Sequence, residues 1–103
     1  MPLLSIIAPT PPLAKISINS LAQGFDKSVA KLPKAVKLTL RQKLEIFVND
    51  PFDDRLRNHG LKGSLRNYRS VNITGDYRLI YEEYDENTIR LIDIGTHSQI
   101  CVI

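Results

Sequence analysis

Two histidines, an aspartate and an arginine in the second half of this chain could move protons and bind phosphate. His59 and His97 each lie in a short glycine-containing segment, Asp76 follows a glycine, and Arg78 lies within an apolar run. Histidine can give or take a proton near neutral pH, and arginine binds two phosphate oxygens without losing its charge. Such groups can cleave RNA through its own 2′-hydroxyl. A base removes the 2′ proton, cations stabilise the charged phosphorane, and an acid protonates the 5′ oxygen.

A second set of residues could hold an RNA backbone or base beside these four. The set contains cationic, amide and aromatic side chains: Lys62, Arg66, Arg69, Asn72 and Tyr68. Lysine and arginine would contact phosphates, asparagine would position a phosphate or hydroxyl, and tyrosine could stack on a base. Each of these residues also has an ordinary structural explanation, as a solvated loop charge or as amphipathic packing.

The acidic residues also have two explanations each. Asp76 after Gly75 is common turn chemistry, although its carboxylate could also orient a histidine. Asp93 lies in an apolar segment, where a charge must be paired or must face a groove. We expect Asp93 to pair with an arginine such as Arg69 or Arg78.

The composition limits the class of protein. The net charge is +3, and all but one of the 14 Lys and Arg residues precede residue 82. A basic body suits an RNA partner, although basic residues that only solvate helix faces explain it equally well. No apolar run approaches the ~20 residues of a membrane span, and residues 3–8 are too short for a signal-peptide core. We therefore expect no membrane contact and a cytoplasmic location.

Cysteine and histidine usage gives two further expectations. The chain has a single cysteine, which excludes an internal disulfide and fits a reducing compartment. Two histidines and one cysteine, widely separated, match no zinc spacing. We therefore expect no metal and no cofactor.

The first half of the chain reads as an arm, a strand and two helices. Residues 1–13 contain four of the six prolines and predict an extended arm. Residues 14–19 predict a short strand, and Ser20 with Gln23 forms a capping-box pattern that opens a first helix. This helix ends before Pro33, which can occupy the first turn of a second helix. The second helix is expected to end at residues 49–51.

Three strands are predicted in the second half, over residues 68–74, 77–84 and 88–95, with a tight turn at Gly75-Asp76. The tail, residues 98–103, could add strand residues. The order β-α-α-β-β-β predicts one α+β domain over residues 14–103, with a two-helix hairpin on one face of a mainly antiparallel sheet. The strand over residues 77–84 is the most apolar and should be central. The opposite face would carry Ser70, Asn72 and Thr74 as a floor for a nucleic-acid backbone.

Four sequence blocks resemble the RelE/ParE superfamily of toxins, and within it the YafQ-like branch. The blocks are His59-x-Leu61-x-Gly63, Tyr68-Arg69-Ser70, Gly75-Asp76-x-Arg78-x-x-Tyr81 and Ile94-Gly95-Thr96-His97. Their order and spacing both agree with the family pattern. The resemblance extends over about residues 14–103, and it implies the RelE-like fold.

The resemblance also implies a function and two kinds of partner. It implies the toxin of a bacterial type II toxin–antitoxin module, a ribosome-dependent mRNA endoribonuclease that needs no metal. Its partners would be a cognate antitoxin that blocks the site, and the ribosome with mRNA in its A site. His59, Asp76 and His97 correspond to the catalytic residues of the YafQ-like branch. Arg78 matches an arginine that contacts the scissile phosphate in RelE relatives.

Two positions depart from the pattern and keep alternatives open. Asn72 stands where a further histidine can occur, and Cys101 replaces an expected aromatic residue. Both changes fit a catalytically inactive, antitoxin-binding relative. A ParE-like inhibitor of DNA gyrase is the other alternative on this fold. The histidine pair argues against it, because such a binder needs no paired titratable groups.

Overall fold

The computed structural model describes residues 16–100 of the chain, so the arm predicted for residues 1–13 and the position of Cys101 lie outside the described residues. The element order begins with one strand and two helices and continues with the strands of the site. The bounds are β1 Ser17–Leu21, α2 Phe25–Ala30, α3 Lys34–Asn49, η2 Asp54–Leu56, β2 His59–Gly60, η3 Gly63–Leu65, β3 Tyr68–Asn72, β4 Tyr77–Glu83, β5 Thr88–Thr96 and α4 His97–Ile100. No helix in this part of the chain is long and apolar enough to cross a membrane.

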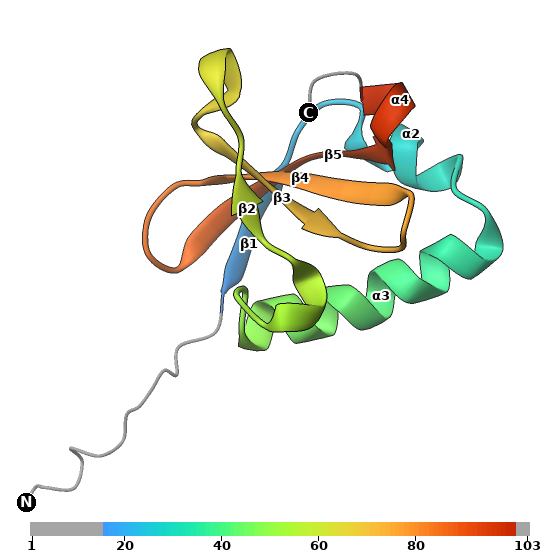
Figure 1. The fold of residues 1–103 in the computed structure, drawn as a ribbon, viewed down its shortest axis with the longest axis horizontal. Coiled ribbons are helices and arrows are strands. Elements are labelled where there is room, and N and C mark those ends of the chain that lie inside the picture. Colours follow the sequence, from blue (N-terminus) through green and yellow to red (C-terminus); the bar gives the residue numbers. More distant parts are fainter. Residues whose placement is uncertain (1–15, 101–103) are drawn as a thin grey trace, which may run out of the picture.

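A five-stranded sheet forms the centre of the molecule, in the order β1-β5-β4-β3-β2 (Figure 1). The pairs β2–β3, β3–β4 and β4–β5 are antiparallel, and β1 runs parallel to β5. The most apolar strand, β4, is therefore central, as its sequence predicts. The α+β prediction with a mainly antiparallel sheet is confirmed.

Helix α3 runs along one side of the sheet, and α2 and α4 both pack against β5 (Figure 1). The core lies between α3 and this side of the sheet. It is formed by buried side chains of the helices, Phe25, Leu40 and Phe47, of the strands, Val71, Leu79, Tyr81, Ile89, Leu91 and Ile94, and of the connecting segments, Leu32, Leu56 and Ile73. Phe47 and Tyr81 meet edge to face with ring centroids 4.9 Å apart, a favourable aromatic geometry.

The first helix differs from the prediction in both length and start. The predicted strand over residues 14–19 lies instead at Ser17–Leu21, so Ser20 belongs to a strand and does not cap a helix. Helix α2 begins only after Gly24, whose φ of 89° is left-handed and unfavourable for other residues. The Ser20–Gln23 capping box is therefore wrong. Helix α3 matches its prediction, with Pro33 in the N-cap position rather than inside the first turn.

Two further predictions are corrected at the C-terminal end. Residues 97–100 form the short helix α4, not added strand, while residues 101–103 lie outside the described part. Asp93 does not pair with an arginine, because its Oδ1 accepts hydrogen bonds from the Ser28 hydroxyl at 3.0 Å and from the Ile94 amide. A hydroxyl on α2 thus satisfies the strand carboxylate and fastens that helix to β5.

The register separates the two faces of the sheet. Val71, Leu79 and Ile94 stand side by side in the core, whereas Asn72, Arg78 and Gly95 form the neighbouring row on the opposite face. The polar surface predicted to bind a nucleic-acid backbone is smaller than expected, because Ser70 on this face is fully buried. Asn72 and Thr74 remain half-buried there.

Candidate functional site

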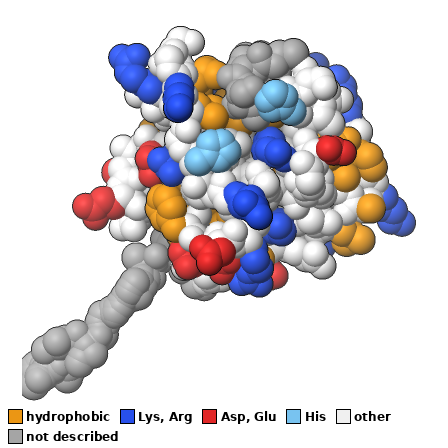
Figure 2. All heavy atoms as spheres, in the orientation of Figure 1, with side chains coloured by type: hydrophobic (Ala, Val, Ile, Leu, Met, Phe, Trp, Pro, Cys, Tyr) orange, Lys and Arg blue, Asp and Glu red, His pale blue; other side chains and the backbone are white. Residues whose placement is uncertain are grey.

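Both histidines of the chain are on one face of the molecule, with lysine and arginine side chains around them (Figure 2). Each histidine is exposed. The two arrive from different elements, since His59 begins β2 and His97 begins α4. Residues 38 positions apart in sequence are therefore brought to one surface by the order of the strands.

The local backbone determines which nitrogen of His59 can act as a base. Its Nδ1 lies 3.0 Å from the Arg57 carbonyl oxygen. A carbonyl can only accept, so Nδ1 carries the hydrogen and Nε2 keeps its lone pair in the neutral ring. Arg57 adopts a left-handed φ of 49°, an uncommon conformation for a residue other than glycine, and so turns its carbonyl toward the ring. The exposed Nε2 can therefore accept a proton from a bound group.

Asn58 fastens the segment that carries His59 to the body of the protein. Its Nδ2 donates to the Pro51 carbonyl at 2.8 Å and to the Tyr81 hydroxyl at 2.7 Å, and its Oδ1 accepts from Arg69 Nε at 2.8 Å. The Arg69 guanidinium also lies 5.2 Å from the centre of the Phe52 ring, a cation–π distance. These contacts limit the movement of the neighbouring His59.

Tyr81 is the buried end of this network, with only 1% of its surface exposed. Burial is the largest cause that raises the pKa of its hydroxyl above the ordinary value of 10, and the hydrogen bond from Asn58 partly opposes it. The hydroxyl therefore stays neutral and serves as an acceptor for Asn58.

His97 is positioned by reciprocal hydrogen bonds across α4. The Thr96 amide donates to Gln99 Oε1 at 2.9 Å, and the Gln99 amide donates to Thr96 Oγ1 at 3.1 Å. This is a capping box, and it holds the turn in which His97 is the first residue. Gly95 makes room for it, since a Cβ there would lie 3.0 Å from Gln99 Oε1.

Arg78 is fixed against its own hairpin. Its Nη1 donates to the carbonyl oxygens of Thr74, Gly75 and Tyr77 at 3.3, 3.0 and 3.4 Å. It stands between Asn72 on β3 and Gly95 on β5. Arg78 is therefore half-buried and held in place, and its register partner Gly95 lies two residues before His97, the first residue of α4.

Asp76 lies exposed in the same turn, where its amide and that of Tyr77 both donate to Thr74 Oγ1. Within the described part of the chain, no hydrogen bond or ion pair joins its carboxylate to either histidine. Its predicted role in orienting a histidine stays a prediction.

The predicted RNA-contacting residues divide between the two faces. Lys62 and Arg66 are exposed on either side of η3, and Tyr68 and Asn72 share the face of His59. Arg69 instead stands in register with Tyr81 and Leu91 on the helix side. The structure therefore brings Asn72 and Arg78 together and separates Arg69 from them.

Sequence reasoning missed two positioning residues, Asn58 and Gln99. Thr96-x-x-Gln99 is a capping-box pattern and could have been recognised. Asn58 gives no such signal, because its three partners come from segments far apart in sequence. The described residues hold no group of three or more His, Cys, Asp or Glu side chains that could bind a metal ion.

The arrangement offers two exposed imidazoles, one fixed guanidinium and exposed flanking cations on a single face. An exposed Nε2 can accept a proton, a second imidazole can supply one when charged, and the cations can bind an anion between them. The chemistry that fits these groups is proton transfer on a phosphodiester.

Residues 19–102 match a family model described as the bacterial toxin of type II toxin–antitoxin system, YafQ. Among solved structures, YafQ from E. coli is similar with a TM-score of 0.68 and 24% identity, over 84% of this chain and 98% of that chain. The E. coli DinJ–YafQ toxin–antitoxin complex is similar with a TM-score of 0.67 and 24% identity, over 84% and 97%. The Mycobacterium tuberculosis RelBE2 toxin–antitoxin complex gives 0.67 and 18%, over 82% and 94%. No curated protein matches the chain.

Proposed function

The chain belongs to the YafQ family of bacterial type II toxin–antitoxin toxins, and from this premise we propose that it is a ribosome-dependent mRNA endoribonuclease. The observation that carries the proposal is the presence of both exposed histidines on one cationic face (Figure 2). A gyrase-binding toxin has no use for two titratable groups that flank a fixed arginine. A phosphodiester-cleaving enzyme needs such groups.

In the proposed step, His59 is the base and His97 is the acid. Nε2 of His59 takes the proton of the 2′-hydroxyl, because its Nδ1 already donates to the Arg57 carbonyl. The 2′ oxygen attacks phosphorus, and the bond from phosphorus to the 5′ oxygen breaks. Charged His97 donates its proton to that oxygen. The products are a 2′,3′-cyclic phosphate and a 5′-hydroxyl, and the step uses no metal ion.

Arg78 would stabilise the phosphorane. Its guanidinium is held by three backbone carbonyls, so its charge needs no rearrangement as negative charge develops. Asn72 beside it would hold a phosphate oxygen or a hydroxyl, and Asp76 would orient or charge-pair a histidine when RNA is bound. The exposed Lys62 and Arg66, together with Tyr68, would contact the mRNA away from the cut. Arg69 lies on the other side of the sheet and would support the site by holding Asn58, not by contacting a phosphate as the sequence predicted.

A cognate antitoxin is the second partner that we propose. In the E. coli complex, YafQ is found with the antitoxin DinJ. A protein that covers the face of His59 and His97 would exclude RNA from it. Activity would then appear only in the free toxin.

The test is primer extension on mRNA engaged by purified ribosomes, with wild type, His59→Gln and His97→Gln. Glutamine keeps hydrogen-bonding capacity and removes the titratable group. We expect discrete A-site cuts by wild type and a loss of about 10²–10⁴-fold in each variant, since each removes one proton-transfer group. Lys34→Gln on exposed α3 is the matched control and should keep full activity.

The ends of the fragments test the proposed chemistry separately. The 5′ end should accept phosphate from a polynucleotide kinase without prior phosphatase treatment. Absence of cuts by wild type on active ribosomes would overturn the proposal. Supercoiling by DNA gyrase in the presence of the protein would then distinguish a gyrase inhibitor from an inactive relative.

A further inference from the structure

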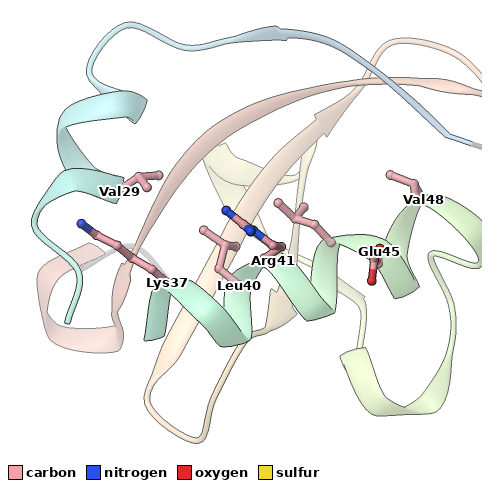
Figure 3. Close-up of a pocket in the computed structure, with 7 residues that line it drawn as sticks. Val29, Lys37, Leu40, Arg41, Glu45 and Val48 are labelled. Atoms are coloured by element: carbon pink, nitrogen blue, oxygen red, sulfur yellow. The ribbon is translucent and has the colours of Figure 1, made fainter. Parts of the chain in front are cut away.

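An open apolar groove runs between α2 and α3, away from the two histidines. Its volume is about 500 Å³, and its floor is formed by Val29, Leu40, Leu44 and Val48. Figure 3 shows Val29 on α2 facing the side of α3 that carries Leu40 and Val48. The charged residues at its edge are Lys37, Arg41 and Glu45. A concave surface that is lined mainly by apolar side chains can hold an apolar ligand or segment.

The described chain begins at one end of this groove. The Ile16 amide donates to the Val48 carbonyl at 2.9 Å, and Val48 is itself a lining residue. From Val48 to Lys37 the groove follows α3 for about 16 Å, at 1.5 Å per residue. A segment that precedes Ile16 therefore starts beside the groove, with no body of protein to cross.

The fifteen residues before Ile16 have the chemistry and the length to fill it. Residues 3–8 are Leu-Leu-Ser-Ile-Ile-Ala, and no charged residue occurs before Lys15. Residues 9–15 contain three prolines, and seven residues in an extended conformation would span roughly 20 Å at ~3.1 Å per residue. That length is enough for residues 3–8 to reach any part of the groove, and proline residues reduce the entropy that a segment loses on docking.

The segment is also an addition to the family domain. The family match starts at residue 19, and E. coli YafQ is covered over 98% of its length by 84% of this chain. We propose that residues 3–8 of this chain dock in the groove between α2 and α3 and cover Val29, Leu40, Leu44 and Val48. An uncharged apolar segment fits this floor better than an acidic partner, which would meet only Lys37 and Arg41 at the edge. The proposal is independent of the cleavage reaction.

Paramagnetic relaxation in the full-length protein tests it. A nitroxide is attached at Ser5→Cys in a Cys101→Ser background, so that the label has one thiol. With the label oxidised, the methyl signals of Val29, Leu40, Leu44 and Val48 should lose intensity relative to the reduced label. Methyl signals of Ile80 and Leu61, on the face of His59, should keep theirs. Ile6→Asp with Ile7→Asp in the same labelled protein should restore the groove signals.

A control label at Ser64→Cys, on exposed η3, should leave the groove signals intact. Equal broadening of both sets of methyls, or broadening that survives Ile6→Asp with Ile7→Asp, would overturn docking and indicate tethering alone. A mixture of two samples tests whether a second copy of the chain is the occupant. One sample carries the nitroxide but no isotope enrichment, and the other is isotope-enriched but carries no nitroxide. Broadening in that mixture means that a second copy fills the groove, which also overturns the proposal. Groove signals that shift only when an acidic amphipathic peptide is added would assign the groove to an external partner instead.

Discussion

Asn58 donates its side-chain amide to the Tyr81 hydroxyl over 2.7 Å, and this hydrogen bond joins the segment of His59 to the core of the sheet. Tyr81 in turn packs edge to face on Phe47 of α3. A residue next to the proposed base is thereby connected to the main helix. The stability of the domain and the position of His59 should therefore change together.

Asn58→Ala should lower both the stability and the cleavage activity. It leaves the Tyr81 hydroxyl and Arg69 Nε without their Asn58 partner, and a buried polar group left unpaired costs about 1–3 kcal/mol. We expect a loss of about 2 kcal/mol in urea unfolding. Cleavage should fall up to ~10²-fold, because a displacement of about 1 Å at a catalytic group has that effect.

Asn67→Ala is the matched control, since Asn67 is exposed near η3. It should change neither the unfolding free energy nor the cleavage rate. A double-mutant cycle of Asn58→Ala with Tyr81→Phe should give a coupling energy of about 0.5–3 kcal/mol, as for other residues in contact. Strict additivity would show that the 2.7 Å hydrogen bond carries no stability.

Tyr81 should make the stability fall at alkaline pH. Burial raises the pKa of its hydroxyl above 10 in the folded state, so the folded protein holds this proton more tightly than the unfolded chain. The stabilisation is therefore complete below pH 10 and is lost as the pH rises through the folded pKa. Urea unfolding of wild type should show this decline, and Tyr81→Phe should show less of it.

Tyr84→Phe is the matched control, because it removes a tyrosine hydroxyl from a side chain that is 52% exposed. Its pH profile should parallel that of wild type. If Tyr81→Phe and wild type lose stability with the same slope above pH 10, buried Tyr81 is not the responsible group.

Arg78→Lys should separate charge from geometry at the hairpin. Lysine keeps the charge but lacks the planar guanidinium, whose Nη1 donates to three carbonyls and which would bind the phosphate in the proposed step. We expect about 1 kcal/mol of lost stability and roughly 10-fold slower cleavage, less than for complete loss of a transition-state donor. Arg41→Lys, at an exposed position of α3 away from the RNA-contacting residues, should change neither. Full activity in Arg78→Lys would remove the guanidinium from the proposed step.

Much of the fold can be predicted from local pattern. The helix that begins after Pro33, the three late strands and the central place of β4 follow from apolar periodicity and from proline and turn positions. The first helix could not be predicted in the same way. Ser20 has the correct spacing for a capping box, but pairing of β1 with β5 outweighs that local preference and keeps it in a strand.

The sequence alone points to the histidines and the arginine of the candidate site, but not to the residues that hold them in position. His59, His97 and Arg78 stand out as residue types in unusual contexts, and the structure gathers them on one face. Arg69 looks equivalent to Arg78 in sequence, yet the register turns it to the helix side. The tertiary network that uses Arg69 to hold Asn58 has no local signature, because its partners meet only after the sheet forms.

Gln99→Ala should slow cleavage while it lowers the free energy of unfolding only modestly. It removes the acceptor of the Thr96 amide, and loss of such a cap costs about 0.5–2 kcal/mol. Gly95→Ala should destabilise α4 by another route, since its new Cβ would lie 3.0 Å from Gln99 Oε1 and 3.5 Å from Ile100 Cγ1. Both changes should displace His97 and slow the cut at the A site.

The double variant distinguishes this arrangement from a general loosening of the tail. Gln99→Ala removes the side-chain amide, whose Oε1 is the atom nearest to a Cβ at Gly95. The loss of stability in the double variant should therefore be smaller than the sum of the losses in the two single variants. Thermal unfolding of wild type, the two single variants and the double variant measures that difference. Hydrogen exchange at the backbone amide of residue 99 reports whether α4 has opened. Exchange as slow as in wild type, combined with slower cleavage, would mean that Gln99 acts on the substrate directly and does not position His97.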